Sequence, residues 1–213
     1  MKTVHQYLPL YPIEPESRRL IVGTIHPQDP SRFKVKFFYG NKGSLWTILH
    51  KAFPSELTDP DSVESIRSFL KARKIAMSDT VAECNRRRPT ALDTDLMDIR
   101  LHEAMIPQIQ NSAIEEIFFT SGFGTNNAFK LFYVDLLQQK ITGDMRGKRE
   151  FMLSSAIFGR PIRLHILHSP AGTANISLSR NSEYLAERHR YEGVKGPVQA
   201  FKIDYYRRVF AIS

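Results

Sequence analysis

Short apolar runs in this sequence end in polar side chains that are able to bind or activate a substrate. Thr24 and His26 follow one run, Asp79 ends a second, Ser121 follows a third and His168 closes a fourth. Hydroxyl, imidazole and carboxylate groups form hydrogen bonds to a substrate and transfer protons during catalysis. These residue types therefore predict a polar site built from several separate loops.

Neither a metal ion nor a nucleotide cofactor is expected at this site. The seven histidines are scattered and Cys84 is the single cysteine, so no metal-ligand spacing is present. Gly122 and Gly124 follow an apolar run as in a dinucleotide-binding loop, but Asn127 stands where that loop needs its third glycine. No glycine-rich phosphate loop ending in Lys-Ser or Lys-Thr occurs.

The apolar runs alternate with segments of helical spacing, which predicts an α/β fold. Strands are expected over 18–24, 74–81, 115–121 and 160–168. Helices are expected over 45–53, 63–70, 101–109, 125–137, 177–190 and 197–211. Ser44, Asp61 and Thr125 are the expected N-caps of the first, second and fourth of these helices.

Strands separated by helices are typical of a short, mostly parallel sheet, and we expect a three-layer α/β/α sandwich around four strands. In such sheets a ligand binds beyond the carboxyl ends of the strands. The loops after Thr24, Ser78, Ser121 and His168 are therefore expected to meet at one site. The long segment 26–41 is expected to add aromatic and amide groups to it.

Length and composition favour one domain. The chain has 213 residues, of which 42% are hydrophobic, enough for a core of its own. We expect a single domain over 1–213, in which 1–17 form an extended, proline-containing arm. No apolar run reaches the roughly 20 residues that span a bilayer, and 1–10 lack a secretory signal. With one cysteine, a cytoplasmic monomer without membrane partners is expected.

The charge balance favours a polyanionic partner. Thirty Lys and Arg residues against 22 Asp and Glu residues give a net charge of +8. Single basic residues are mostly solvated charges, but together they fit the footprint of a nucleic acid. The candidates are Lys34, Lys36, Arg86, Arg87, Arg88, Arg146, Lys148 and Arg149.

Five short motifs occur in a characteristic order. They are Ile21-Val22-Gly23-Thr24, then Phe37-Phe38-Tyr39-Gly40-Asn41 with Leu45-Trp46, Ile75-Ala76-Met77-Ser78-Asp79, Phe118-Phe119-Thr120-Ser121-Gly122, and His168-Ser169-Pro170-Ala171 with Ala174-Asn175. Their order, from about Leu8 to Phe210, resembles the uracil-DNA glycosylase superfamily and is most similar to its hypoxanthine (deoxyinosine) glycosylase branch. The sequence differs in a shortened stretch before Trp46 and in the extra residues Gly172 and Thr173.

The resemblance implies a DNA glycosylase of base excision repair, which removes uracil or hypoxanthine by water attack on the N-glycosidic bond. Such an enzyme flips the nucleotide into a pocket and stabilises the negative charge that develops on the departing base. The implied partner is duplex or single-stranded DNA, and no cofactor is implied. The alternative is a module on the same scaffold that binds a nucleic acid or nucleobase without catalysis. A third hypothesis for the function is an enzyme that acts on small molecules such as nucleotides.

Four residues are candidates for catalysis, namely Asn41, His168, His26 and Asp79. Asn41 presents its amide to the base edge or orients the water, and His26 is its rival for holding the water. The resemblance implies that His168 faces the base oxyanion, and Asp79 is a helper carboxylate. The alternatives are a turn for Asn41, a surface loop for His26, the core for His168 and a turn cap for Asp79.

Further candidates bind the base or the DNA backbone. Those for the base are Thr24, Tyr39, Ser121 and Asn175. Tyr39 is expected to stack on the flipped base, or else to pack in the core beside Trp46. Ser121 is expected to donate to the base or a phosphate, or else to cap its own backbone. The DNA-binding candidates are Ser169, Pro170, Ala171, Gly172, Thr173, Arg86, Arg87 and Arg88, with Gly172 and Thr173 as the wedge that enters the duplex.

Overall fold

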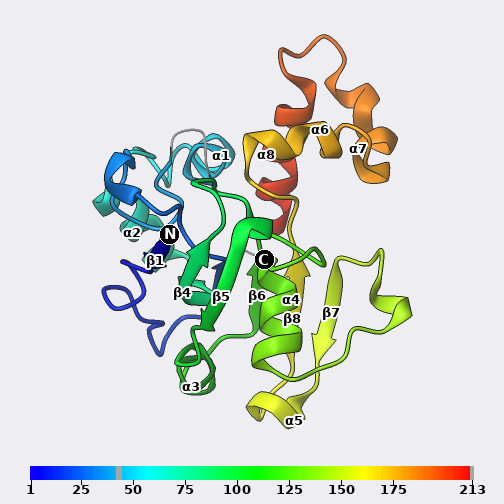
Figure 1. Cartoon of the computed structure of the whole chain (residues 1–213). Coiled ribbons are helices and arrows are strands. Elements are labelled where there is room, and N and C mark those ends of the chain that lie inside the picture. The colour runs from blue at the N-terminus through cyan, green and yellow to red at the C-terminus, as the bar shows by residue number, and fades with distance from the viewer. Residues whose placement is uncertain (42–44, 212–213) are drawn as a thin grey trace. The chain divides into compact units, whose positions relative to one another are not determined.

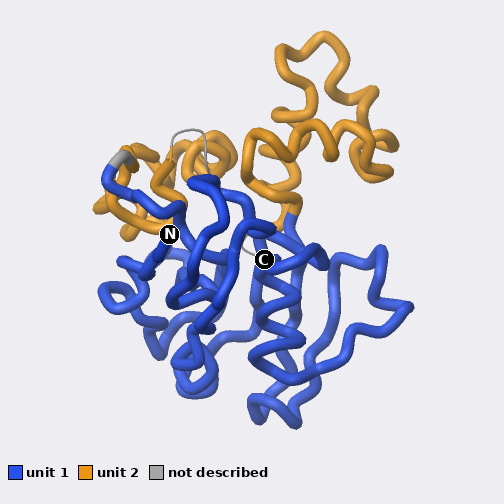
Figure 2. Tube along the Cα trace, in the orientation of Figure 1, with its two compact units in different colours: residues 1–31, 70–167 blue, residues 32–69, 168–213 orange. Residues whose placement is uncertain are grey.

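The computed structural model of the chain describes residues 1–41 and 45–211 (Figure 1). Its residue contacts divide the chain into two compact units, each made from two separate stretches (Figure 2). Unit 1 comprises Met1–Ser31 and Leu70–Leu167, and unit 2 comprises Arg32–Phe69 and His168–Ser213. The expected Ser44 cap lies outside the described residues. In the described ranges, no helix has both the length and the apolar character that crossing a bilayer requires.

A five-stranded, mostly parallel sheet forms the centre of unit 1, so the chain has a mixed α/β fold. The strands lie in the order β3 (Ile75–Asp79), β2 (Arg19–Gly23), β6 (Glu116–Phe119), β8 (Ile162–Ile166) and β7 (Glu150–Leu153). The first four run parallel and correspond to the four expected strands. The expected strand number is corrected to five, because β7 adds to β8 in the antiparallel direction.

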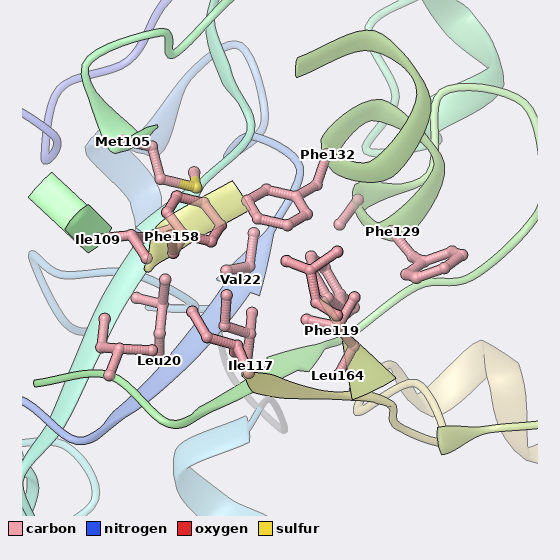
Figure 3. Packing of buried hydrophobic residues seen from close by; sticks show 14 of the residues in the cluster. Leu20, Val22, Met105, Ile109, Ile117, Phe119, Phe129, Phe132, Phe158 and Leu164 are labelled. Carbon is pink, nitrogen blue, oxygen red and sulfur yellow. The ribbon is translucent and has the colours of Figure 1, made fainter. Parts of the chain in front are cut away.

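The main core of unit 1 covers one face of this sheet. Alternate residues of the central strands point to the same side, among them Leu20, Val22, Ile117, Phe119 and Leu164 (Figure 3). They pack against α3 (Met105–Gln110), α4 (Ala128–Lys130) and α5 (Ser155–Phe158). Nearly continuous burial along β2 and β3 explains why these strands are recognisable as apolar runs in the sequence.

A second, antiparallel sheet in unit 1 was not expected. It contains β1 (Lys2–Val4), β4 (Val81–Arg86) and β5 (Leu96–Leu101), with β4 in the middle. The amino-terminal segment, expected as an extended arm, thus contains a strand that is hydrogen-bonded to β4. The β4–β5 register shifts between Val81 and Asn85, which breaks the alternation of apolar and polar residues by which strands are recognised.

Two helix predictions in unit 1 are corrected. Residues near Leu101 belong to β5, and α3 begins only at Met105. The helix expected from Thr125 begins at Ala128 and continues as a π-helix, η3 (Leu131–Leu136). The Ala128 N–H donates to Ser121 Oγ at 2.8 Å, so a serine outside the helix supplies the N-terminal acceptor.

Unit 2 contains helices and connecting loops. Its elements include α1 (Leu45–Ala52), α6 (Asn175–Leu178), α7 (Ser182–Glu187), the 3₁₀ turn η6 (Arg188–Tyr191) and α8 (Pro197–Phe210). The helix expected over 177–190 is broken, because Asn181 caps a new helix by accepting from the Glu183 N–H. By contrast, α8 agrees with its prediction to within one residue.

The helix α2 (Val63–Ala72) begins in unit 2 and ends in unit 1. Its expected cap was Asp61, but the Ser65 N–H donates to Ser62 Oγ, which places the cap one residue later. Inside unit 2, α8 packs along α1, and Arg207 Nε donates to the Ala52 carbonyl at 3.2 Å. This helix pair is the framework from which the loops of unit 2 extend.

Candidate active site

Three polar side chains meet at the carboxyl edge of the parallel sheet in unit 1. Thr24 follows β2, and its Oγ1 donates to Asp93 Oδ2 at 3.0 Å. Ser121 follows β6, and its Oγ donates to the same carboxylate oxygen at 3.5 Å. Two predicted base-binding residues are therefore brought together on a carboxylate that the sequence analysis did not select.

The environment of Asp93 raises its pKa from 3.8 to about 6. Burial is the main cause, and the nearby charge of Asp79 acts in the same direction. The hydroxyl of Thr24, the charge of Arg86 and the hydroxyl of Ser121 partly offset this rise. A carboxylate with a pKa just below neutral is deprotonated at pH 7 and remains able to accept a proton.

Asp93 lies in the connection between β4 and β5, which places it at the edge of the parallel sheet. Asp93 begins a 3₁₀ turn, η2 (Asp93–Asp95), whose last residue is buried and bonded to Arg88 Nε at 3.0 Å and to the Thr90 hydroxyl. On the other side, Asn126 Nδ2 donates to the Asp93 carbonyl at 3.0 Å. The backbone at Asp93 is thus held from both sides.

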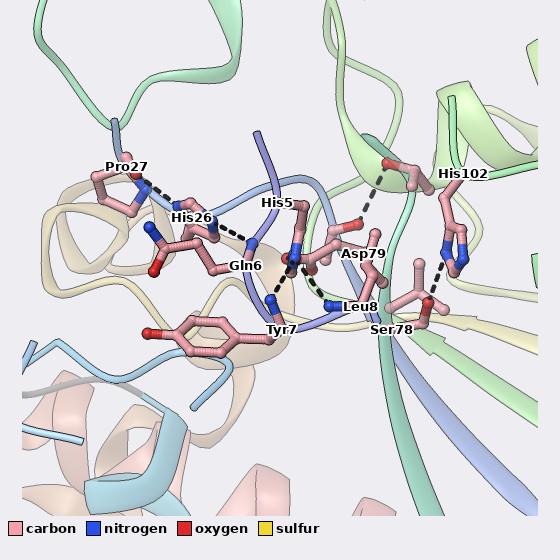
Figure 4. Close-up of polar contacts among 12 residues, drawn as sticks. His5, Gln6, Tyr7, Leu8, His26, Pro27, Ser78, Asp79 and His102 are labelled. Atoms are coloured by element: carbon pink, nitrogen blue, oxygen red, sulfur yellow. Dashed lines mark hydrogen bonds and ion pairs between the residues drawn. The ribbon is translucent and has the colours of Figure 1, made fainter. Parts of the chain in front are cut away.

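Another carboxylate, Asp79, is buried at the end of the neighbouring strand β3. His5 Nε2 donates to Asp79 Oδ2 at 2.7 Å, and both side chains are almost fully buried (Figure 4). The other ring nitrogen, His5 Nδ1, accepts from the backbone N–H groups of Tyr7 and Leu8. These bonds fix the imidazole tautomer with its proton on Nε2. His5 was not recognised from the sequence.

His26 is buried, and both of its ring nitrogens bond the main chain of unit 1. Nε2 accepts from the Gln6 N–H at 3.1 Å, and Nδ1 donates to the Pro27 carbonyl at 2.6 Å (Figure 4). Burial is the largest cause that lowers the pKa of His26. The structure therefore shows a neutral histidine that ties the first loop to the amino-terminal segment, and its role in holding a water stays a prediction.

The three consecutive arginines occupy different environments. Arg86 is buried and donates to the carbonyls of His26 and Thr90. Arg88 forms an ion pair with Asp95, whereas Arg87 is exposed. The Arg86 guanidinium is used inside unit 1, so the exposed Arg87 is the most direct candidate for a phosphate contact.

In unit 2 the aromatic loop has a strained and tightly packed backbone. Tyr39 is half-buried and adopts a left-handed conformation with φ of 53°. A Cβ on Gly40 would lie 1.9 Å from the Val35 carbonyl oxygen, so only glycine fits there. Trp46 Nε1 donates to the Phe38 carbonyl at 2.6 Å and so holds the loop to α1. Asn41 is exposed at the end of this loop.

The closing loop also belongs to unit 2. His168 is buried, and its Nε2 lies 2.8 Å from Glu183 Oε2. The remaining predicted DNA-binding residues, Ser169, Pro170, Ala171, Gly172 and Thr173, follow it and become exposed from Ala171 onward. Asn175 donates through Nδ2 to Gln199 Oε1 at 3.2 Å. The expected convergence of Tyr39, Asn41, His168 and Asn175 on the strand ends of unit 1 stays a prediction.

The described residues contain no group of three or more His, Cys, Asp and Glu side chains arranged to hold a metal ion. What unit 1 offers instead is a proton-accepting carboxylate beside two hydroxyls, next to a buried histidine–carboxylate pair. The chain matches no model of a known protein family and no curated protein.

Proposed function

We propose that this protein is a monofunctional DNA glycosylase, which hydrolyses the N-glycosidic bond of a flipped uracil or hypoxanthine in DNA. The proposal includes the three-layer sandwich and the motif roles that the resemblance implies. The observation that carries it is the gathering of Thr24 and Ser121, from two strand ends, on the Asp93 carboxylate. Polar groups at the carboxyl ends of parallel strands are the usual place for a ligand.

The chemistry requires a proton acceptor and hydrogen-bond donors. Water attacks the sugar carbon C1′, the bond from C1′ to the base nitrogen breaks with its electrons going to the base, and the water gives up a proton. In the proposal Asp93 accepts that proton, because its pKa of about 6 leaves it ionised at neutral pH. The Thr24 and Ser121 hydroxyls bind the carboxylate and orient it.

The net charge of +8 supports DNA as the substrate. In the proposal the exposed Arg87 and the exposed end of the closing loop contact phosphates without reading sequence. Tyr39, Asn41 and His168 enter the proposal through the family resemblance alone, as the stacking ring, the amide partner of the base and the oxyanion donor.

The test is base release from oligonucleotides that carry one uracil or one inosine, followed by alkaline cleavage of the abasic product. We expect scission by the wild type and a loss of roughly 10²- to 10³-fold for Asp93→Asn. Asp144→Asn is the matched control, because that carboxylate is 73% exposed and bonds Thr142 and Lys148 instead of the cluster residues. No scission by the folded wild type on either substrate would overturn the proposal.

A second candidate function is binding of nucleic acid without catalysis. It is favoured by the complete hydrogen bonding of His26 and by the contact of Asp79 with His5, which engage two of the predicted catalytic residues inside the protein. This function predicts salt-dependent binding to DNA with no base release from pH 5 to 9. The same oligonucleotides distinguish the two functions.

A further inference from the structure

Two side chains of α8 bond the backbone of the closing loop. Lys202 Nζ donates to the Ala171 carbonyl at 3.1 Å, and Tyr206 Oη donates to the His168 carbonyl at 2.7 Å. The two residues lie four positions apart, so they project from the same face of the helix. Both are fully buried, with exposures of 0%. The loop is therefore held at both ends of its His-Ser-Pro-Ala segment.

Lys202 is an unusual residue to bury for packing alone. An ammonium group has three donors, and in the described part of the chain its acceptor is the single carbonyl of Ala171. Burial lowers the pKa of Lys202 to about 8 with no carboxylate to oppose it. A methionine of similar volume would fill the space without this desolvation cost. The position therefore favours a task that needs the donor or the charge.

The segment between the two anchored carbonyls is short and internally braced. The Ala171 N–H donates to Ser169 Oγ at 3.3 Å, and the ring of Pro170 fixes its own backbone torsion. The bonds to α8 hold the carbonyls of His168 and Ala171 against the helix. Beyond Ala171 the chain is exposed at Gly172 and Thr173. The anchors thus set the direction in which the exposed residues leave the protein.

We propose that Lys202 and Tyr206 are positioning residues, which hold the closing loop by its carbonyls and so preorganise its exposed edge for binding DNA. The catalytic consequence rests on the proposed function, whereas the anchoring itself is a property of unit 2. Neither residue contacts the reacting atoms in this inference. They act through the backbone of His168 and Ala171.

Hydrogen exchange followed by mass spectrometry measures the anchoring directly. We expect Lys202→Met and Tyr206→Phe each to speed exchange at the hydrogen-bonded loop amides 171 and 174 by about 2- to 10-fold, the range of one lost hydrogen bond. Lys202→Gln keeps an N–H donor without the charge, and we expect it to restore part of the protection. Arg208→Met is the control, because Arg208 lies on the exposed side of α8 and bonds Glu187.

Kinetics then test the positioning role. For the double variant we expect kcat/KM to fall by about tenfold or more, mainly through a higher KM, with the melting temperature of Tyr206→Phe within a few degrees of wild type. Wild-type exchange at 171 and 174 in both folded single variants would overturn the anchoring, whatever the activity. Unchanged kinetics in an active enzyme would overturn the positioning role. Faster exchange in a protein without glycosylase activity would leave the anchoring standing and reject the proposed function alone.

Discussion

The polar edge of unit 1 and the loops of unit 2 are held in place by different kinds of contact. In unit 1 side chains of the candidate site bond one another, as Thr24 and Ser121 bond Asp93. In unit 2 buried side chains from helices bond backbone carbonyls, as Trp46 bonds the carbonyl of Phe38. The difference indicates that the polar edge of unit 1 responds to pH through Asp93, whereas the aromatic loop of unit 2 depends on the shape of its backbone.

Among the substitutions considered, Gly40→Ala in unit 2 is expected to destabilise the protein most. We expect this substitution to lower the free energy of unfolding by about 3 kcal/mol, because the new Cβ meets backbone oxygen atoms that cannot move aside. Urea denaturation measures the change. Gly143→Ala in unit 1 is the control, since a Cβ there meets nothing within 4 Å. Equal stability of the two variants would contradict the tight packing at Gly40.

The side-chain support of unit 1 is tested by His5→Leu. Removal of the imidazole leaves the buried Asp79 carboxylate without its partner, which costs about 1–3 kcal/mol. Thermal or urea unfolding detects this loss. Lys2→Ala on the preceding strand β1 should cost less than His5→Leu, because its ion pair with Glu83 is at the surface.

The pH response expected of unit 1 is tested by Asp93→Asn. The pKa of Asp93 in the folded protein, about 6, is above its ordinary value of 3.8, so the folded state binds the extra proton. The free energy of unfolding of the wild type should therefore fall, relative to the variant, as pH rises from about 4 to 6. Urea melts at several pH values measure this difference.

Asp144→Asn is the control, because its effect on the pH dependence of the free energy of unfolding is expected to have the opposite sign. A hydrogen bond from Thr142 is the largest cause that lowers the pKa of Asp144, so its ionised form is favoured in the folded state. Its wild-type side chain should lose stabilisation as pH falls below the ordinary value of 3.8. If the two substitutions changed the pH dependence of the free energy of unfolding in the same direction, the raised pKa of Asp93 would be contradicted.

Smaller effects are expected when one hydrogen bond is removed from each unit, by Trp46→Phe in unit 2 and by Thr24→Val in unit 1. Trp46→Phe should lower the free energy of unfolding by about 1–2 kcal/mol at every pH, because it removes the bond to the Phe38 carbonyl. Thr24→Val should instead raise the pKa of Asp93 further, because the hydroxyl bond lowers it. The two variants are compared by urea melts and by NMR titration. If the stability lost in Trp46→Phe varied with pH, the proposed difference between the two units would be contradicted.

The smallest expected effect is that of Arg87→Ala. If this exposed side chain contacts a phosphate, the slope of log binding constant against log salt should fall by about 1, with stability unchanged. Arg86→Met should show the reverse, a loss of stability, because the guanidinium bonds the carbonyls of His26 and Thr90. Fluorescence anisotropy with labelled DNA measures the first effect.

The sequence predicted the parallel strands of unit 1 because β2, β3 and β6 are short apolar runs followed by polar residues. It also predicted α8, which has Pro197 in its first turn after a left-handed Gly196. Thr24 and Ser121 were selected because residues at strand ends share one edge of a sheet. Local pattern was sufficient for each of these predictions.

The partners of these residues come from segments whose local pattern is weak. Asp93 lies in a polar stretch, and the hairpin that carries it has a shifted register that hides the strand periodicity. His5 reaches Asp79 only because β1 adds to β4, a contact between distant parts of the chain. Such contacts depend on tertiary structure and leave no spacing signal in the sequence.

The hairpin that carries Asp93 is anchored at its base and open at its tip. Arg86 bonds the His26 carbonyl, and Arg88 and Thr90 bond the buried Asp95. The exposed residues without such a bond are Arg87, Pro89, Ala91 and Leu92. These four residues are therefore able to change during evolution, or in a mutant library, without loss of the bonds that hold the Asp93 turn. The hairpin is thus built so that its outer surface varies while the Asp93 carboxylate keeps its place at the sheet edge.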